Sequence, residues 1–269
     1  MSYYHHLIQA TLPASYLLDT YTNAKVAFSV RKLSSAYSGN CIKVRRSSDN
    51  TEQDIGFVGN VLDTTSLLAF CGAGDGFVTV FYDQSGNALN ATQSSSVSQP
   101  KIVSSGSVVL SPSTSNPAMH CSVAFHRFEI TNFALPANFL QSLVYNRALT
   151  NETVGLSGLS SPYPYLVYLS GNDVYINTGS FNLFGASSTG NKIAISYKKS
   201  GNNSGIYLNG SQLGSEFNLG VSSGNLSYLF DRAGASGGNY YSECVFWDTD
   251  KSADISGINI NTNTYYGIY

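Results

Sequence analysis

A chain of 269 residues with 42% hydrophobic and only 11% charged residues can build a large core but carries little charge for its surface. Its net charge of −2 gives no field that would gather nucleic acid or an anionic membrane, so neither is an expected partner. The 25 glycines and 19 tyrosines suit short strands joined by tight turns. We expect one all-β domain over residues 1–269, with residues 1–20 as an N-terminal arm or edge segment.

In the first third of the chain, helix-like spacing predicts a short helix over residues 23–33, after a polar cap at Thr22 or Asn23. Alternation over residues 42–45 predicts a half-buried strand. Asp63 precedes an apolar run that Gly72 closes, which is typical of a capped helical turn or two. Residues 77–82 are apolar on both faces and predict a central strand.

Further along, the Ser- and Pro-rich stretch 94–117 is interpreted as strands and loops within the domain, because neither flank could close a sandwich alone. Residues 252–266 place apolar side chains at three- and four-residue steps, which predicts a short helix packed on the sheet. Expected strands cover 101–103, 107–110, 120–125, 165–169, 173–176, 192–197, 205–208, 227–230 and 240–247.

The four cysteines, Cys41, Cys71, Cys121 and Cys244, lie far apart and have no metal-ligand spacing. We expect free buried thiols, and neither a metal nor a cofactor. The first residues lack the basic and apolar stretches of a secretory signal, which predicts synthesis without export. A surface poor in charge is nevertheless typical of extracellular proteins, and a virion protein made in a host cytoplasm would reconcile the two signals.

The most recognisable cluster of polar residues is the YDQSGN motif, made of Tyr82, Asp83, Gln84, Ser85, Gly86 and Asn87. A calcium or sugar site is one interpretation. A structural role is favoured, because Asp and Asn side chains close turns onto their own backbone and Gly86 permits a conformation that other residues resist.

Two groups of segments resemble a known family. Residues 27–31, 44–49, 70–71 and 81–87, with the Thr92-Gln93 pair, resemble the start of the catalytic domain of α-L-arabinofuranosidase B. Residues 205–210 and 241–247 resemble the closing strands of concanavalin-like and laminin-G-like sandwiches. The resemblance implies a concanavalin A-like jelly-roll β-sandwich with a few short helices, a class that also occurs in phage structural proteins.

The resemblance also implies a retaining hydrolase with two carboxylates about 5 Å apart. The family's nucleophile is a Glu in the middle of the domain, but this chain has no Glu between Glu152 and Glu216. Its acid/base is an Asp in a Gly- and Asn-rich loop, which makes Asp231 the one weak catalytic candidate. An exposed turn residue beside Arg232 is the favoured interpretation of Asp231. Glu129, Glu152, Asp173 and Glu216 stay open as sources of another carboxylate pair.

Aromatic side chains are the best candidates for glycan contact, because the CH face of a sugar stacks on a ring. Beside predicted loops and strand ends lie Tyr163, Tyr165, Tyr240 and Tyr241, and with Asp231 they form the predicted glycan-binding set. Trp247, inside a strand, is expected in the core. His5, His6, His120 and His126 come without a nucleophile motif and support no catalytic triad.

The missing Glu, the low charge and the absent signal together predict a non-enzymatic bacteriophage virion protein. Its place would be head decoration, a fibre or the tail, with binding of host glycans for adhesion. Its partners would be other virion proteins and cell-surface glycans, and a homo-oligomer is expected for this class. The alternative is an α-L-arabinofuranosidase-like glycoside hydrolase or polysaccharide depolymerase. A purely structural protein without a ligand is the third hypothesis.

Overall fold

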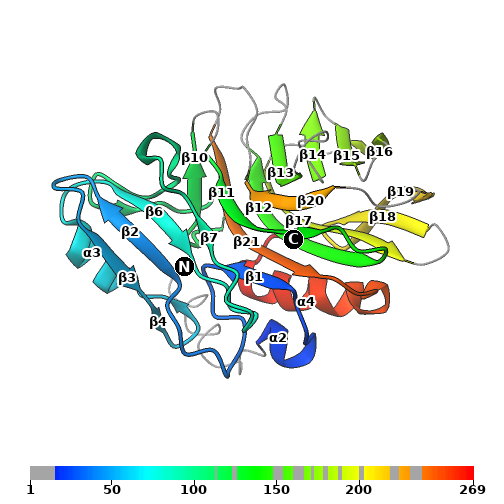
Figure 1. The fold of residues 1–269 in the computed structure, drawn as a ribbon, viewed down its shortest axis with the longest axis horizontal. Coiled ribbons are helices and arrows are strands. Elements are labelled where there is room, and N and C mark those ends of the chain that lie inside the picture. Colours follow the sequence, from blue (N-terminus) through cyan, green and yellow to red (C-terminus); the bar gives the residue numbers. More distant parts are fainter. Residues whose placement is uncertain are drawn as a thin grey trace, which may run out of the picture.

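The protein is described by a computed structural model (Figure 1), which covers residues 16–112, 114–122, 126–147, 154–159, 167–170, 173–177, 181–186, 190–199, 203–218, 224–230 and 238–269. Antiparallel strands form most of it, and the few helices are short. The elements of the N-terminal half are, in chain order, α2 (Leu17–Thr20), β1 (Val26–Ser29), β2 (Ile42–Arg46), β3 (Glu52–Ile55), β4 (Phe57–Val58), β5 (Val61–Leu62), α3 (Thr64–Cys71), β6 (Gly76–Phe81), β7 (Ala91–Thr92), the 3₁₀ helix η1 (Ser96–Ser98), β8 (Lys101–Ser104), β9 (Ser107–Val108), β10 (Met119–Cys121) and β11 (Phe128–Ala134).

The C-terminal half adds the longest strands and the longest helix. Its elements are β12 (Phe139–Arg147), β13 (Val154–Leu159), β14 (Val167–Ser170), β15 (Asp173–Asn177), β16 (Phe181–Ala186), β17 (Gly190–Lys199), β18 (Asn203–Leu208), β19 (Ser211–Phe217), β20 (Asn225–Leu229), β21 (Asn239–Trp247), the 3₁₀ helix η2 (Ser252–Asp254) and α4 (Ile255–Tyr266).

One layer, which we call the front sheet, is built around β21. On one edge β21 pairs with β12, which continues to β17, β18 and β19. Its other edge is shared by β1, opposite residues 243–246, and β10, opposite residues 239–241. Figure 1 shows β12, β17 and β18 on one side of β21 and β1 on the other.

The second layer, the back sheet, runs from β7 through β11, β20, β13, β14 and β15 to β16. Strand β6 joins the two layers, because it pairs with β7 of the back sheet and with β8, which leads through β10 to β21. On its other edge β6 pairs with β2, which pairs with β3. The ladder thus folds over at β6 and its two arms face each other.

The inner core lies between these arms. Phe28, Leu143 and Phe246 enter it from the front sheet, and Ile176 and Leu229 from the back sheet, all at most 1% exposed. Burial of this size is the main favourable term in folding. The predicted all-β concanavalin-like sandwich with a few short helices is confirmed by this architecture.

A second core covers the outer face of the front sheet. Ala27, Ile195 and Val245 pack there against Ile258 of α4 and Leu17 of α2. Figure 1 shows α4 lying along β21 and β1, with α2 beside it. The central strands of the front sheet are therefore buried on both faces, which explains their nearly continuous apolar runs.

This double burial overturns the helix predicted over residues 23–33. The segment forms strand β1 instead, with Val26, Phe28 and Val30 in the inner core and Ala27 in the outer one. Apolar residues on both sides of a strand happened to give the three- and four-residue steps of a helix.

Other elements are confirmed. Asp63 caps α3, with its carboxylate accepting the Ser66 N–H at 2.9 Å, and Gly72 ends the helix at φ 60°. Hydrogen bonds from the Ser66 hydroxyl and then from its N–H lower the pKa of Asp63. The predicted central strand is β6, the predicted C-terminal helix is η2 with α4, and the other predicted strands match β2, β8–β10, β14, β15, β17, β18, β20 and β21 within a few residues. No helix in the described part of the chain is long and apolar enough to cross a membrane.

Candidate functional site

The YDQSGN motif follows β6 and binds the backbone of β1. The Asp83 carboxylate accepts the N–H groups of Ala27 at 2.8 Å, Ser85 at 2.9 Å and Leu89 at 3.0 Å, and the Ser85 hydroxyl at 2.7 Å. Asp83 is only 3% exposed, and its carboxylate oxygens accept hydrogen bonds from these four protein donors. The carboxylate therefore closes a turn.

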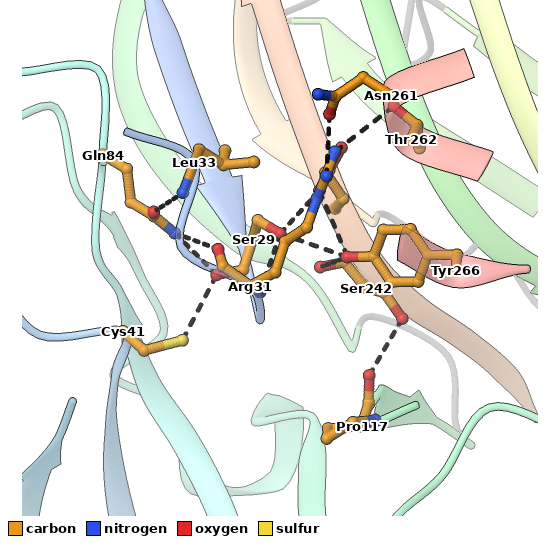
Figure 2. Close-up of polar contacts among 11 residues, drawn as sticks. Ser29, Arg31, Leu33, Cys41, Gln84, Pro117, Ser242, Asn261, Thr262 and Tyr266 are labelled. Carbon is orange, nitrogen blue, oxygen red and sulfur yellow. Dashed lines mark hydrogen bonds and ion pairs between the residues drawn. The ribbon is translucent and has the colours of Figure 1, made fainter. Parts of the chain in front are cut away.

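The amide groups of the motif act on the same segment. Gln84 donates to the carbonyls of Ser29 and Arg31 at 2.8 and 3.1 Å and accepts the Leu33 N–H at 2.8 Å (Figure 2). Asn87 donates to the carbonyls of residues 24 and 25. Gly86 has φ 93°, in the region that favours glycine. These contacts agree with the structural interpretation of the motif.

Beneath α4, the front sheet carries a buried ion pair. Register places Ser29 of β1 directly opposite Glu243 of β21, with Arg31 two residues further along. Arg31 Nε and Nη2 donate to the two carboxylate oxygens of Glu243 at 2.7 and 3.0 Å, and the Ser29 hydroxyl donates at 2.8 Å. Arg31 is 4% and Glu243 0% exposed, so the pair is shielded from solvent.

Helix α4 completes this cluster (Figure 2). The Asn261 side-chain oxygen accepts from Arg31 Nη1 at 2.9 Å, and the Tyr266 hydroxyl lies 3.3 Å from Glu243 Oε2 and 3.2 Å from Ser29 Oγ. Burial raises the pKa of Tyr266 well above its usual value, and the charge of Glu243 adds to the effect. Each charged atom of the cluster has a protein partner, so it anchors α4 and offers no place for a substrate.

The predicted catalytic and glycan-binding residues fall partly beyond these elements. Tyr163, Tyr165 and Asp231 lie outside the described residues. Tyr241 is 0% exposed and stacks on Phe230 at a centroid distance of 4.3 Å. Its ring fills the inner core and cannot reach a sugar in solvent, which corrects its prediction as a glycan contact.

Tyr240 points to the opposite face of β21 and is partly exposed. Its ring stacks on His120 of β10 at 4.5 Å with an interplanar angle of 11°. Gly238 makes room for the imidazole, because a Cβ at that position would overlap His120 Nε2. Tyr240 is thus partly exposed, and its contact with a glycan stays a prediction.

Tyr240 belongs to a longer arrangement that the sequence did not reveal. Directly opposed residues in neighbouring strands form a row across the sheet: Tyr240 (β21), His120 (β10), Lys101 (β8), Phe77 (β6) and Arg45 (β2). We call these five residues the outer row. Alternation over residues 42–45 placed Arg45 on the polar face of its strand, but the pairing of strands distant in sequence was needed to align it with the other four residues.

The other carboxylates considered are described in part. Glu216 accepts the Tyr197 hydroxyl at 2.6 Å, Asp173 the Tyr175 hydroxyl at 3.4 Å, and Glu129 is exposed opposite Tyr228 of β20. Glu152 lies outside the described residues. Trp247 is fully buried and donates to the Tyr21 carbonyl at 3.0 Å, a core position as expected. The described residues contain no group of three or more His, Cys, Asp and Glu that could hold a metal.

Comparison with known proteins finds a family match for the first part of the chain. The family model described as "Alpha-L-arabinofuranosidase B, catalytic" matches residues 18–122. These residues include β1, the YDQSGN motif and the outer-row strands β2, β6, β8 and β10. No curated protein matches the chain.

Solved structures extend the likeness in fold. A mutant of GH54 α-L-arabinofuranosidase soaked with 4-nitrophenyl α-L-arabinofuranoside superposes with a TM-score of 0.70 at 18% identity, covering 94% of this chain and 65% of that one. The enzyme soaked with a cyclic sulfate inhibitor gives 0.66 at 16% identity, with 94% and 65% covered. An arabinofuranosidase complexed with arabinofuranosyl-α-1,2-xylobiose gives 0.64 at 17%, with 93% and 64% covered.

The chain therefore spans less than two thirds of the length of these enzymes. At these identities the superpositions establish the fold and leave the chemistry open. The comparisons favour an arabinofuranosidase-like domain, and they contain nothing that points to a phage virion. This chain resembles the catalytic domain of α-L-arabinofuranosidase B in the sequence of its first part and in its β-sandwich fold.

Proposed function

We propose that this chain is an α-L-arabinofuranosidase-like, carbohydrate-active domain that acts on glycans bearing arabinofuranosyl groups. The observation that carries the proposal is the match of residues 18–122 to the catalytic-domain model, supported by superposition of most of the chain on GH54 enzymes. The matched segment includes the YDQSGN motif and the contacts that it makes with β1.

Hydrolysis of this type needs an acid/base and a second carboxylate. Asp231 is the proposed acid/base, because it lies in the Gly-rich segment before β21. The second group would come from Glu129, Glu152, Asp173 or Glu216, since no Glu stands between Glu152 and Glu216. A separation of about 5 Å would predict retention of configuration, and a wider one inversion through a bound water.

The test is release of nitrophenol from 4-nitrophenyl α-L-arabinofuranoside, the compound soaked into the similar enzyme. We expect turnover that Asp231→Asn lowers by a factor of about 100 or more, in the range of general acid catalysis. Asp250→Asn is the matched control, because Asp250 is exposed and caps the nearby Ser252 N–H at 2.9 Å. Absence of turnover on arabinofuranosides would reject the hydrolase.

A second candidate is a non-enzymatic bacteriophage virion component, for head decoration, a fibre or the tail, that binds cell-surface glycans as a homo-oligomer. One observation favours it: the middle of the chain offers Asn, Thr and Ser where the similar enzymes have their Glu nucleophile. An amide or hydroxyl there cannot form the usual glycosyl ester. The low surface charge suits a protein that ends up outside the cell.

A glycan array combined with the hydrolysis assay separates the two candidates. The virion component predicts saturable binding without turnover, weakened by replacing Tyr163, Tyr165 or Tyr240 with Ala. Mass spectrometry of purified particles would find the chain among the virion proteins, and native mass spectrometry would find an oligomer. Turnover on arabinofuranosides together with absence from particles would exclude this candidate.

A further inference from the structure

We propose that the outer row is a binding surface for an acidic polysaccharide, one whose sugar units carry carboxylates. The choice of a glycan rests on the proposed function. The surface itself rests on the alignment of Arg45, Phe77, Lys101, His120 and Tyr240 across five neighbouring strands.

The row is one continuous face. Residues directly opposite each other in neighbouring antiparallel strands point to the same side of a sheet, with Cβ atoms about 5 Å apart. Two ring contacts confirm this at the ends: Arg45 lies 4.8 Å from the Phe77 ring centroid, and His120 stacks on Tyr240. With a strand spacing of about 4.8 Å, five strands give a row about 19 Å long, which suits a chain molecule lying across the strands.

Cations dominate one end of the row. The Arg45 guanidinium and the Lys101 ammonium both lie over the Phe77 ring, at 4.8 and 5.6 Å from its centroid. Arg45 is held by the neutral side chains of Gln99 at 2.7 Å and Asn50 at 2.7 Å, neither of which offsets its charge. These contacts fix the guanidinium in place before a ligand arrives, which lowers the entropy cost of binding.

Two acidic side chains lie at the border of this surface. Lys101 shares its charge with Asp75 at 2.8 Å, and the exposed Glu52 of β3 stands opposite Arg45 beyond the end of the row. A cation paired with a partly exposed carboxylate can exchange it for a ligand carboxylate at small cost, because surface ion pairs contribute little. Removing the Asp75 charge should therefore strengthen binding of an anion.

The other end of the row supplies two aromatic side chains. Tyr240 and His120 are both partly exposed and stack on each other with ring centroids 4.5 Å apart. Aromatic rings that contact sugar CH groups, next to fixed cations that bind carboxylates, match a uronate-containing polysaccharide better than a neutral one. A single-stranded nucleic acid uses similar groups, so it must be a competitor in the test.

The experiment measures binding of the full chain to polygalacturonate by isothermal titration calorimetry at low salt. The matched ligand control is the same polymer after its carboxylates have been reduced to alcohols. We expect binding to the acidic form that weakens as salt is added, because exposed charges are screened. Equal binding of both forms, or of oligothymidylate as tightly as of the polyuronate, would overturn the proposal.

Variants then locate the site. Arg45→Gln should weaken binding about tenfold, since one charge-assisted hydrogen bond contributes about 1.5 kcal/mol or more. Tyr240→Ala should also weaken it, and Asp75→Asn should tighten it. Lys32→Gln removes the same charge outside the row and should leave affinity unchanged. Unchanged affinity in Arg45→Gln with a normal melting temperature would reject the binding surface. The hydrolysis assay with Asp231→Asn tests the proposed function separately, and its outcome does not change the affinities measured for the outer-row variants.

Discussion

The Glu243 carboxylate is fully buried in the front sheet and meets the Arg31 guanidinium through hydrogen bonds of 2.7 and 3.0 Å. Ser29 and Tyr266 occupy further positions around the same oxygens. Both charges lost their hydration on folding, so each one needs the other to offset the cost of its burial. We expect Glu243→Gln to lower the free energy of unfolding by about 3–5 kcal/mol, through an uncompensated guanidinium, as measured by urea denaturation.

Two controls distinguish charge from shape at this position. The double variant Arg31→Met with Glu243→Gln should recover much of the loss, because it removes the stranded charge. Asp49→Asn breaks an exposed ion pair with Arg46 at 2.6 Å and should change stability far less. If Glu243→Gln unfolds at the same urea concentration as the parent chain, the cluster does not stabilise α4.

For single residues, the sequence predicted contacts between near neighbours in the chain better than contacts between distant ones. The Asp63 cap and the turn chemistry of Asp83 and Gly86 follow from neighbours within a few residues, and both occur in the structure. The Arg31–Glu243 pair spans 212 positions, and its two residues lie in separate segments at opposite ends of the chain. No rule of spacing could have joined them before β1 was known to pair with β21.

Among the elements, strands that are buried on both faces were the hardest to predict. The sequence FLQSLVYNR of β12 has no alternation, yet all nine residues are buried because the inner core lies on one side and α4 and its neighbours on the other. The same double burial made β1 resemble a helix. Where one face meets solvent, as in β2, alternation located the strand.

Helix α4 illustrates an element that depends on packing. Its sequence, ISGININTNTYY, is rich in Asn and Thr, which are weak helix formers. Ile258 is fully buried against the front sheet, whereas Ile260 on the same helix is 64% exposed. We expect Ile258→Ala to lower the free energy of unfolding by about 2–5 kcal/mol, measured by urea denaturation.

The matched control lies two residues away. Ile260→Ala removes the same atoms from the same helix without opening a cavity, and should change the free energy of unfolding by about 0.5 kcal/mol or less. Because Ala forms helices more readily than Ile, propensity alone predicts no loss in either variant. An equal loss in both would contradict the view that contact of Ile258 with the sheet holds α4 in place.

For the whole molecule, the sequence was sufficient for fold class and insufficient for a site. Alternation and turn residues indicated an all-β domain, because these signals are local and recur along the chain. The resemblance of the YDQSGN region and of the closing strands to a known family implied the concanavalin-like sandwich. The outer row required five strands to be placed in register. Tyr241 was assigned to the glycan-binding set because it lies near a predicted strand end, but its side chain faces the inner core, whereas that of its neighbour Tyr240 is partly exposed. Register, which periodicity alone does not fix, decides which face a residue meets.

The raised pKa values of several tyrosines make the stability of the whole fold depend on pH in the alkaline range. Burial raises the pKa of Tyr37 to about 12, and it raises the pKa values of Tyr82, Tyr197, Tyr265 and Tyr266 as well. An unfolded phenol ionises near pH 10. Between about pH 10 and 12 the unfolded chain therefore holds fewer protons than the folded one, and the free energy of unfolding falls as the pH rises.

We accordingly expect stability from these phenols to be fully present below about pH 10 and to be lost above it. Tyrosinate absorbance and far-ultraviolet circular dichroism, followed together during an alkaline titration, should report ionisation of the buried phenols and loss of strand structure in the same step. Tyr197→Phe should move that step to higher pH, because the folded state no longer has to keep this phenol neutral beside Glu216. Ionisation of nearly all tyrosines around pH 10 with the strand signal intact would contradict the burial on which both cores depend.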